Sequence, residues 1–225
     1  MGRRIAPLTV DELPDLIECC RQCVFWELTP VDEARAHRAG QCALRKEQWV
    51  SHVLLEWGSC GQVAYVDGAA VGHVLYAPPV FLPRIASFPT APMSPDAVAL
   101  GSLRVREDYR GGGLARVLIQ SMAADLVRRR VRAVEAIATV GIPSNGTVDS
   151  AHREADVECT VPAAMLLAVG FATARAHART PRLRLELSTT VTWREDAVAG
   201  ALERLRSLRA PVRALRRDSS QWSRP

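Results

Sequence analysis

Residues 107–120, EDYRGGGLARVLIQ, place three consecutive glycines directly before an apolar run that starts at Leu114. The start of a helix leaves backbone N–H groups unpaired and carries the positive end of the helix dipole. Glycines let a phosphate group come close to that backbone and let the chain adopt positive φ. Arg110 adds a positive side chain at the same point. The stretch therefore suits a pyrophosphate group, and the glycines alone are equally compatible with an ordinary turn between a strand and a helix.

Two common phosphate-binding loops do not fit this stretch. A P-loop requires Lys followed by Ser or Thr after its last glycine, whereas Gly113 is followed by Leu114 and Ala115. A dinucleotide-binding fingerprint requires a third glycine, and Arg116 stands at that position. Glu135 lies at a suitable distance for the acidic residue of that fingerprint, but the sequence contains no second βαβ half.

The glycine-rich stretch resembles the acyl-coenzyme A signature of the GNAT N-acetyltransferase superfamily. Residues 110–115, RGGGLA, match its pattern Arg/Gln-x-x-Gly-x-Gly/Ala, and residues 102–119 are similar to the family's strand, bulge, loop and helix. An Asp-Gly pair at 67–68 lies upstream, where the family has its second and third strands, and AAMLLAVGF at 163–171 is similar to its short helix ending in Gly-Phe. The resemblance is closest to uncharacterised actinobacterial members, which share the Cys-x-x-Cys-x-Phe-Trp-Glu segment and a proline-rich loop.

This resemblance implies the α/β fold of GNAT acyl-CoA N-acyltransferases, a mixed central sheet with helices on both faces. It implies acetyl-CoA as the co-substrate. The backbone of the strand at Leu103, Arg104 and Val105 is expected to pair with the pantetheine amides of the coenzyme. The pyrophosphate is expected at Arg110, Gly111, Gly112, Gly113, Leu114, Ala115 and Arg116. The acetyl thioester is expected in a splay beside residues 132–140.

The implied function is transfer of an acetyl group from acetyl-CoA to a primary amine, by direct attack in a ternary complex. The acceptor is a small-molecule or protein amine that the sequence does not identify. Many family members place a tyrosine four residues before the glycine of Gly-Phe, as the acid that protonates the leaving thiolate, but here that residue is Leu166. This departure favours the alternative of a coenzyme A-binding regulatory or sensor module with weak or no turnover.

Two carboxylates are candidates for the base that makes the acceptor amine neutral. Glu135 lies within the apolar strand predicted at 132–140, where burial is expected to raise the pKa of a carboxyl group toward a useful value. Glu27 is expected at the end of the first helix, beside Phe25 and Trp26, which are suited to lining an acceptor pocket. For both residues the competing interpretation is an ion-paired or surface carboxylate.

The six cysteines do not form a metal-binding pattern. Cys20 and Cys23 have Cys-x-x-Cys spacing, but a zinc site requires two more ligands at matching spacing. Cys42, Cys60 and Cys159 are isolated. We therefore expect free thiols in a reducing compartment and no metal. Cys159 precedes the predicted short helix, where its thiol could approach that of the coenzyme as a proton donor.

The order of apolar and polar residues predicts the elements that position these groups. Thr9 or Asp11 is expected to cap a helix that extends to about residue 28, and a second helical region covers residues 31–58. Asp67-Gly68 joins two apolar runs into a β-hairpin. The other predicted segments are a strand at 3–9, a proline-rich loop at 77–96, a polar loop at 141–160, a short helix at 161–171, and final strands at 171–178 and 182–188.

The glycine turn itself belongs to a predicted βαβ unit. A buried strand at 97–105 precedes it, a helix at 114–130 follows, and a second strand lies at 132–140. Because a crossover helix joins parallel strands, this unit predicts a parallel or mixed sheet.

The length of 225 residues and the hydrophobic content of 48% suit one large domain. We expect a GNAT domain at 1–190, followed by a charged helix and a basic tail at 191–225. The formal net charge is +5. The phosphates of a coenzyme explain part of it, and a nucleic-acid partner is not expected because no stacking surface or helix-turn-helix is visible.

The setting of the protein is also predicted from the sequence. The first ten residues do not resemble a secretory signal, and no run of about 18 apolar residues occurs. We expect a cytoplasmic protein without membrane association, either a monomer or a homodimer. A chain rich in Arg, Ala and Val and almost without Lys is typical of a bacterium with a GC-rich genome.

Overall fold

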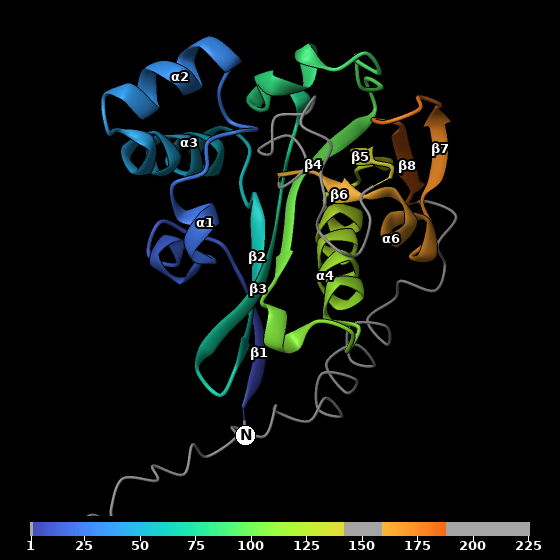
Figure 1. Ribbon diagram of the computed structural model, residues 1–225. Coiled ribbons are helices and arrows are strands. Elements are labelled where there is room, and N and C mark those ends of the chain that lie inside the picture. Colours follow the sequence, from blue (N-terminus) through green and yellow to red (C-terminus); the bar gives the residue numbers. More distant parts are fainter. Residues whose placement is uncertain (1, 142–158, 188–225) are drawn as a thin grey trace, which may run out of the picture.

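A computed structural model describes residues 2–141 and 159–187. These residues form an eight-stranded sheet in which seven strands follow the order β1-β2-β3-β4-β5-β8-β7 and β6 pairs with β5 (Figure 1). The strands are β1 (Arg3–Pro7), β2 (Gly61–Val66), β3 (Ala69–Ala77), β4 (Ala97–Val105), β5 (Ala133–Thr139), β6 (Val161–Pro162), β7 (Ala172–Arg175) and β8 (Arg182–Glu186). The predicted helix and tail at 191–225, and nearly all of the polar loop at 141–160, lie outside the described residues.

The directions of the strands confirm a mixed sheet. Within the described residues, β5 runs parallel to β4 and to β6, and the other paired strands are antiparallel. The helix α4 (Leu114–Arg128) connects β4 to β5, so the predicted βαβ unit is present.

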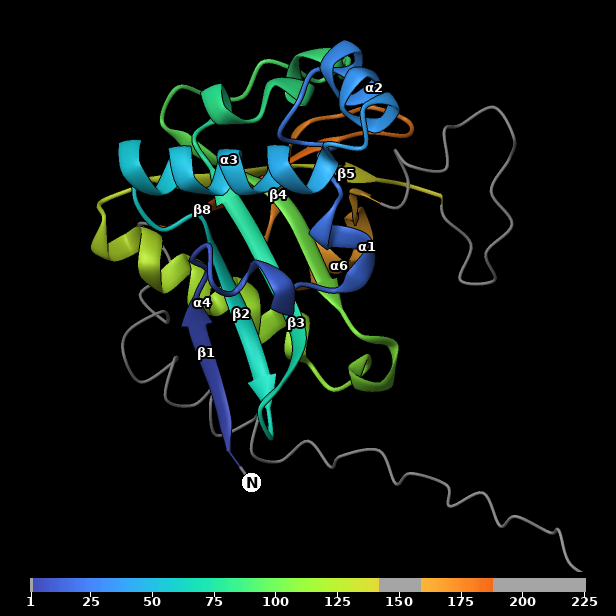
Figure 2. The same cartoon turned by 90° about the vertical axis from the view of Figure 1, so that its left-hand side faces the viewer.

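Helices lie on both faces of this sheet, as predicted (Figures 1 and 2). One face carries α1 (Glu18–Arg21), α2 (Pro30–Arg38) and α3 (Cys42–Glu56), and the other carries α4 and α6 (Ala163–Ala168). Each face of the sheet therefore has its own apolar core, because the apolar side chains of that face pack against the apolar sides of the helices that cover it. No helix within the described residues is long and apolar enough to cross a membrane.

The two cores use alternate residues of the same strands. The core under α4 combines helix residues such as Leu118 and Met122 with Val74 and Leu103 of the sheet. The core under α3 is made by aromatic and aliphatic side chains, which include Phe25, Trp26, Trp49, Val50, Val53, Val63 and Leu75. Burial of this amount of apolar surface is the main favourable term in folding.

The first predicted helix is wrong over most of its length. Helical backbone is limited to a 3-10 turn (Leu13–Asp15) and the four residues of α1. Leu16 and Ile17 between them have ψ of 151° and 136°, which are extended values, and Leu16 is fully buried. Pro14 also restricts helix to a first turn. Tertiary burial of Leu16 thus overrides the helical periodicity, and Glu27 lies in the segment before α2 rather than at a helix end.

The second predicted helical region is divided into α2 and α3. Gly40, with φ of +63°, ends the first of them, and the Gln41 N–H donates to the Ala36 carbonyl at 2.9 Å. The predicted hairpin is confirmed, because Asp67 and Gly68 both have positive φ, 50° and 83°, as a two-residue hairpin turn requires.

The proline-rich segment at 77–96 is a packed loop with two 3-10 turns, at Pro79–Phe81 and Pro83–Ser87. Its apolar residues Leu82, Ile85 and Met93 are buried in the α3-side core. The loop is also joined to the far end of the chain, since the Thr90 hydroxyl donates to the Thr180 carbonyl at 2.9 Å. It therefore covers one end of the sheet over the same face as α3.

The pairing of β4 has two irregularities that shape the rest of the molecule. Against β3, Leu100 pairs with Tyr76 and Ser102 with Leu75, so Gly101 is an extra, bulged residue. Against β5, pairing covers only the three residues from Ala97 to Ala99 and then stops. From there the two strands diverge, and the second half of β4 is paired with β3 on one edge but not with β5 on the other.

The close contact of β3 with β4 gives a test of this packing. A Cβ atom at Gly72 would lie 2.8 Å from the Arg104 carbonyl oxygen, whereas one at Gly101 would meet no atom closer than 3.5 Å. We expect Gly72→Ala to lower the free energy of unfolding by about 1–3 kcal/mol, because the strands must move apart. Gly101→Ala is the matched control and is expected to unfold close to wild type in urea titrations. Equal losses in the two variants would contradict this packing.

Candidate functional site

The predicted pyrophosphate turn forms an open helix start. A 3-10 turn at Glu107–Tyr109 follows β4 and leads into the glycines. Gly111 and Gly113 have φ of 78° and 82°, and Gly113 is the N-cap of α4. No side chain caps the helix, and a Cβ atom at either glycine would have no neighbour within 4 Å. The first N–H groups of α4 therefore point to an uncovered surface, as an anion site requires.

Two arginines connect this turn to its surroundings. The Arg110 guanidinium donates to the Val105 carbonyl at 3.2 Å and pairs with Glu107, so it lies at the end of β4. The Arg116 guanidinium donates to the Ala168 carbonyl at the end of α6 at 2.8 Å. The unpaired edge of β4, which contains Leu103 and Val105, leads directly to this turn.

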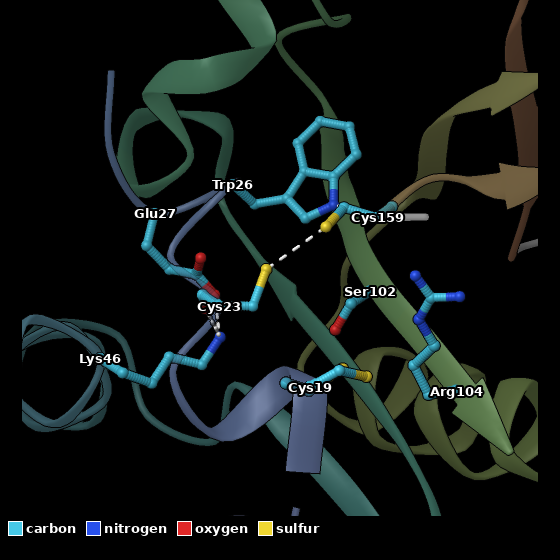
Figure 3. Close-up of a pocket in the computed structure, with 9 residues that line it drawn as sticks. Cys19, Cys23, Trp26, Glu27, Lys46, Ser102, Arg104 and Cys159 are labelled. Carbon is cyan, nitrogen blue, oxygen red and sulfur yellow. Dashed lines mark hydrogen bonds and ion pairs between the residues drawn. The ribbon is translucent and has the colours of Figure 1, made fainter. Parts of the chain in front are cut away.

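A pocket lies on the face of β4 that is turned away from α4 and toward α1 and α3 (Figure 3). It contains about 390 Å³ of space, part of which is open to solvent. Its lining residues are Cys19 and Cys20 of α1, Cys23, Trp26 and Glu27 of the following segment, Lys46 of α3, Ser102 and Arg104 of β4, and Cys159. The pocket thus combines residues that are more than 100 positions apart in the sequence.

The pocket contains a buried ion pair between Glu27 and Lys46. The two residues are 6% and 2% exposed, and the Lys46 ammonium donates to Glu27 Oε1 and, at 3.0 Å, to the Cys23 carbonyl. Burial alone would lower the pKa of Lys46, but the adjacent Glu27 carboxylate raises it above the ordinary value. Lys46 is therefore a permanent cation that holds one oxygen of Glu27.

Several polar groups of the pocket have no partner among the described residues. Glu27 Oε2 and the Ser102 hydroxyl are buried and make no hydrogen bond. The half-buried Arg104 also lines the pocket. Because buried polar groups are normally paired, these atoms are suited to contacting a polar ligand.

A comparison with protein families decides what this arrangement belongs to. The sequence model of the acetyltransferase (GNAT) family matches residues 20–148, more than half of the chain. The chain belongs to the GNAT acetyltransferase family. The match includes β2, β3, β4, the glycine turn, α4 and β5, so the predicted recognition of this superfamily is confirmed and the protein is an acetyltransferase-family enzyme.

This GNAT chain is similar to solved structures at low sequence identity. PaiA N-acetyltransferase from Thermoplasma acidophilum, solved in complex with coenzyme A, is 11% identical, with 83% of this chain and 99% of that chain covered and a TM-score of 0.51. Ribosomal-protein-alanine N-acetyltransferase from Brucella melitensis is 18% identical, with 81% and 99% covered and a TM-score of 0.47. No curated protein matches the sequence.

Glu135, the other catalytic candidate of this GNAT protein, does not line the pocket. Its fully buried carboxylate accepts hydrogen bonds from the Ser94 N–H at 3.0 Å and the Ser94 hydroxyl at 2.6 Å. It also pairs with Arg182 at 3.4 Å and Arg184 at 3.2 Å. These contacts join the proline-rich loop, β5 and β8 at the point where β4 and β5 separate, so the structure does not bring Glu135 and Glu27 together.

The position of the family's tyrosine acid carries no acid here. Leu166 is fully buried in the core under α4. The hydroxyls of Tyr65 and Tyr76 donate to Asp15 at 2.6 Å and to Asp125 at 2.9 Å. Among the described residues that line the pocket, none is a tyrosine.

Sequence reasoning missed Lys46, although the sequence carried a signal for it. Lys46 is the only lysine of the chain and lies on the apolar stripe of α3 with Cys42, Trp49, Val50 and Val53. A charge on such a stripe requires a buried partner.

Within the described residues, no group of three or more His, Cys, Asp or Glu side chains is arranged to hold a metal ion.

His73 is a second buried polar residue beside the pocket. It lies on β3 between Val63 of β2 and Arg104 of β4, and both ring nitrogens are without a hydrogen bond among the described residues. Burial, with the nearby charges of Lys46 and Arg104, lowers the pKa of His73 to about 3. The imidazole is therefore neutral in the folded protein at all moderate pH values.

This lowered pKa makes stability depend on pH. Below about pH 6.5 the unfolded chain binds a proton at His73 that the folded chain does not bind until about pH 3. Above about pH 6.5, His73 therefore causes no loss of stability. As the pH drops below this value, the free energy of unfolding decreases, and at pH 5 this residue has lowered it by about 2 kcal/mol. His73→Leu is expected to remove that loss in urea titrations at pH 7 and pH 5. His52→Leu, at an exposed histidine, is the control. If wild type and His73→Leu lose the same free energy of unfolding between pH 7 and pH 5, the prediction is wrong.

Proposed function

We propose that this protein transfers an acetyl group from acetyl-CoA to a primary amine, by direct attack of the amine in a ternary complex. The observation that carries the proposal is the divergence of β4 and β5 after Ala99, because it opens one edge of β4 between an uncapped helix start and a polar pocket. An extended ligand that carries amides and a pyrophosphate is complementary to such an edge and helix start.

The coenzyme side of the site is assigned to β4 and the glycine turn. The free backbone groups at Leu103, Arg104 and Val105 are suited to pairing with pantetheine amides as an added strand would. The pyrophosphate is assigned to the N–H groups from Gly111 to Arg116, where the dipole of α4 favours negative charge. Arg110 adds a guanidinium at the same end.

The acceptor side is assigned to the pocket, with Glu27 as the base. Glu27 Oε2 is buried and free to accept a proton from the ammonium form of the acceptor, while Lys46 holds Oε1 and fixes the carboxylate. Glu135 remains the second candidate, but the contacts with Ser94 and two arginines already occupy its carboxylate. We therefore rank Glu27 first.

The alternative is a coenzyme A-binding sensor with weak or no turnover. It is favoured by Leu166, which provides no proton for the leaving thiolate, and by the lack of a pocket tyrosine within the described residues. The two functions differ in one measurement. An enzyme releases free coenzyme A thiol in the presence of an amine panel, whereas a sensor binds acetyl-CoA and releases none.

We propose a cytoplasmic protein of an actinobacterium, which acts on a small-molecule or protein amine as a monomer or homodimer. The arginine-rich, nearly lysine-free composition supports the bacterial setting. The domain limits at 1–190 and 191–225 are proposed on the same sequence pattern.

The glycine turn provides the test of coenzyme binding. Gly113→Glu places a negative charge at the helix start, and we expect acetyl-CoA binding, measured by calorimetry, to weaken at least about tenfold. Gly113→Gln adds the same bulk at φ of 82° without the charge, so it separates backbone strain from repulsion.

A second control variant addresses stability. Gly68→Glu has the same positive φ, 83°, and equally open surroundings, but lies in the hairpin away from the turn, so it is expected to bind like wild type. If wild type binds no acetyl-CoA, or if Gly113→Glu binds like Gly68→Glu, the coenzyme assignment is wrong.

The role of Glu27 is tested with a paired substitution. Glu27→Gln alone would leave Lys46 as an unpaired buried charge, which typically costs about 3–5 kcal/mol. The double variant Glu27→Gln/Lys46→Met removes both charges. We expect it to fold and to bind acetyl-CoA, while thiol release falls about 10²–10⁴-fold because the base is missing.

The matched control removes another buried ion pair. Arg84 Nη1 and Glu33 Oε2 lie 2.7 Å apart, and the two side chains are 5% and 16% exposed. Neither residue lines the pocket. Glu33→Gln/Arg84→Met is expected to retain thiol release. If the Glu27 double variant keeps wild-type rates while Glu135→Gln loses activity without unfolding, the base is Glu135 instead.

A further inference from the structure

Two thiols from distant parts of the chain meet in the pocket. Cys23 lies in the segment after α1, and Cys159 lies just before β6, 136 positions later. Their sulfur atoms are 3.3 Å apart. The dashed line in Figure 3 marks the hydrogen bond between them. Both residues are half-buried and line the pocket, so a small molecule that enters it reaches the sulfurs.

Neighbouring hydrogen bonds hold both cysteines in place. The Trp26 indole N–H donates to the Cys159 carbonyl at 2.8 Å, which fixes the start of β6 against the segment after α1. The Lys46 ammonium donates to the Cys23 carbonyl at 3.0 Å. A disulfide has an S–S distance of about 2.05 Å, so the two sulfurs, at 3.3 Å, are in contact but not bonded.

The pair also differs chemically from the other buried thiols. The hydrogen bond from the Cys159 thiol lowers the pKa of Cys23 to about 7, against the opposing effect of burial. Burial raises the pKa of Cys20 to about 12 and that of Cys60 to about 12. Because the thiolate is the reactive form, Cys23 is the pocket thiol that is suited to attack an oxidant.

We propose that Cys23 and Cys159 are an oxidation site, at which a peroxide produces a reversible disulfide that closes the pocket. Formation of the disulfide is independent of the proposed function, whereas its effect on acetyl transfer rests on it. The acceptor side would then work only while the pair is reduced.

The reaction balances in two steps. The Cys23 thiolate attacks hydrogen peroxide, the O–O bond breaks, and a sulfenic acid and hydroxide form. The Cys159 sulfur then attacks the Cys23 sulfur, the S–O bond breaks, and the thiol proton leaves with the hydroxyl group as water. In the reduced pair, the largest cause of the raised pKa of Cys159 is its hydrogen bond to Cys23. A dithiol reductant restores both thiols.

Cys19 and Cys20 are the competing pair, with sulfurs 3.7 Å apart. They are adjacent residues in α1, so a disulfide between them would have to distort the helix backbone. Cys20 is also buried and carries a raised pKa. The geometry therefore favours oxidation at Cys23 and Cys159.

The disulfide would change the pocket at its centre. The Lys46 ammonium donates both to the Cys23 carbonyl and to Glu27. A bond that pulls Cys23 toward Cys159 is therefore expected to shift Lys46, which holds the proposed base. It also draws together the two walls that the sulfurs form. We expect acetyl transfer to fall at least about tenfold on oxidation, which a dithiol reverses.

The test begins with the full chain and no coenzyme. Purified reduced protein is treated with hydrogen peroxide, and unreacted thiols are alkylated before digestion and mass spectrometry. We expect a loss of about 2 Da, from two hydrogens, and a crosslinked peptide that joins Cys23 to Cys159. Cys159→Ser is expected to lose this crosslink, and Cys60→Ala, at a buried cysteine outside the pocket, is expected to retain it.

The outcomes separate this proposal from the proposed function. A Cys19–Cys20 disulfide, or Cys23 and Cys159 recovered as free thiols, overturns the oxidation site. A crosslinked protein whose thiol release equals that of the reduced form overturns pocket closure alone. A reduced protein that releases no thiol with any amine counts against the enzyme and leaves the mapped crosslink as support for the oxidation site.

Discussion

The parallel pairing of β4 with β5 lasts for three residues, and the rest of the site depends on this limit. Two strands that remained paired would leave no free edge between them, and the residues beyond Ala99 would be an ordinary buried sheet. Because the strands diverge instead, the second half of β4 is supported by β3 on one side and open on the other. The bulge at Gly101 adds a local twist at the same point and directs Ser102 and Arg104 toward α1 and α3. One departure from regular pairing thus creates both the free backbone edge and the lining of the pocket.

The two ends of this opening are built differently. At its apex, the buried carboxylate of Glu135 joins the proline-rich loop to β8 through Ser94, Arg182 and Arg184. At its far end, the glycines start α4 with unpaired N–H groups, and Arg116 connects that helix to the end of α6. A carboxylate with several charged and hydrogen-bonded partners is costly to disturb, so the apex is rigid, while the glycine end remains accessible to an anion.

Local sequence signals predicted the parts of this structure that depend on neighbouring residues. The Asp67-Gly68 hairpin and the βαβ unit around the glycine turn follow from turn chemistry and periodicity, and both are present. The prediction of the first helix is wrong because burial of Leu16 requires an extended backbone, which no local sequence pattern indicates. The contact of Cys23 with Cys159 spans 136 positions and depends on how the whole sheet is closed, so spacing alone could not reveal it. Glu27 was selected for its aromatic neighbours, whereas its buried partner on α3 was not foreseen.

The identity of that partner explains why a chain that has arginine, not lysine, at every other position occupied by either residue keeps one lysine. Lys46 must fit between Glu27 Oε1 and the Cys23 carbonyl inside an apolar core, and an ammonium is a compact charge whose three donors can turn toward both. An arginine carries a planar fork with five donors, and burial at this point would leave several of them unpaired. The same cation therefore supports the carboxylate proposed as the base and the backbone of the low-pKa thiol. Since both groups depend on one buried charge, we expect a change at the thiol pair to reach the base through the Lys46 side chain.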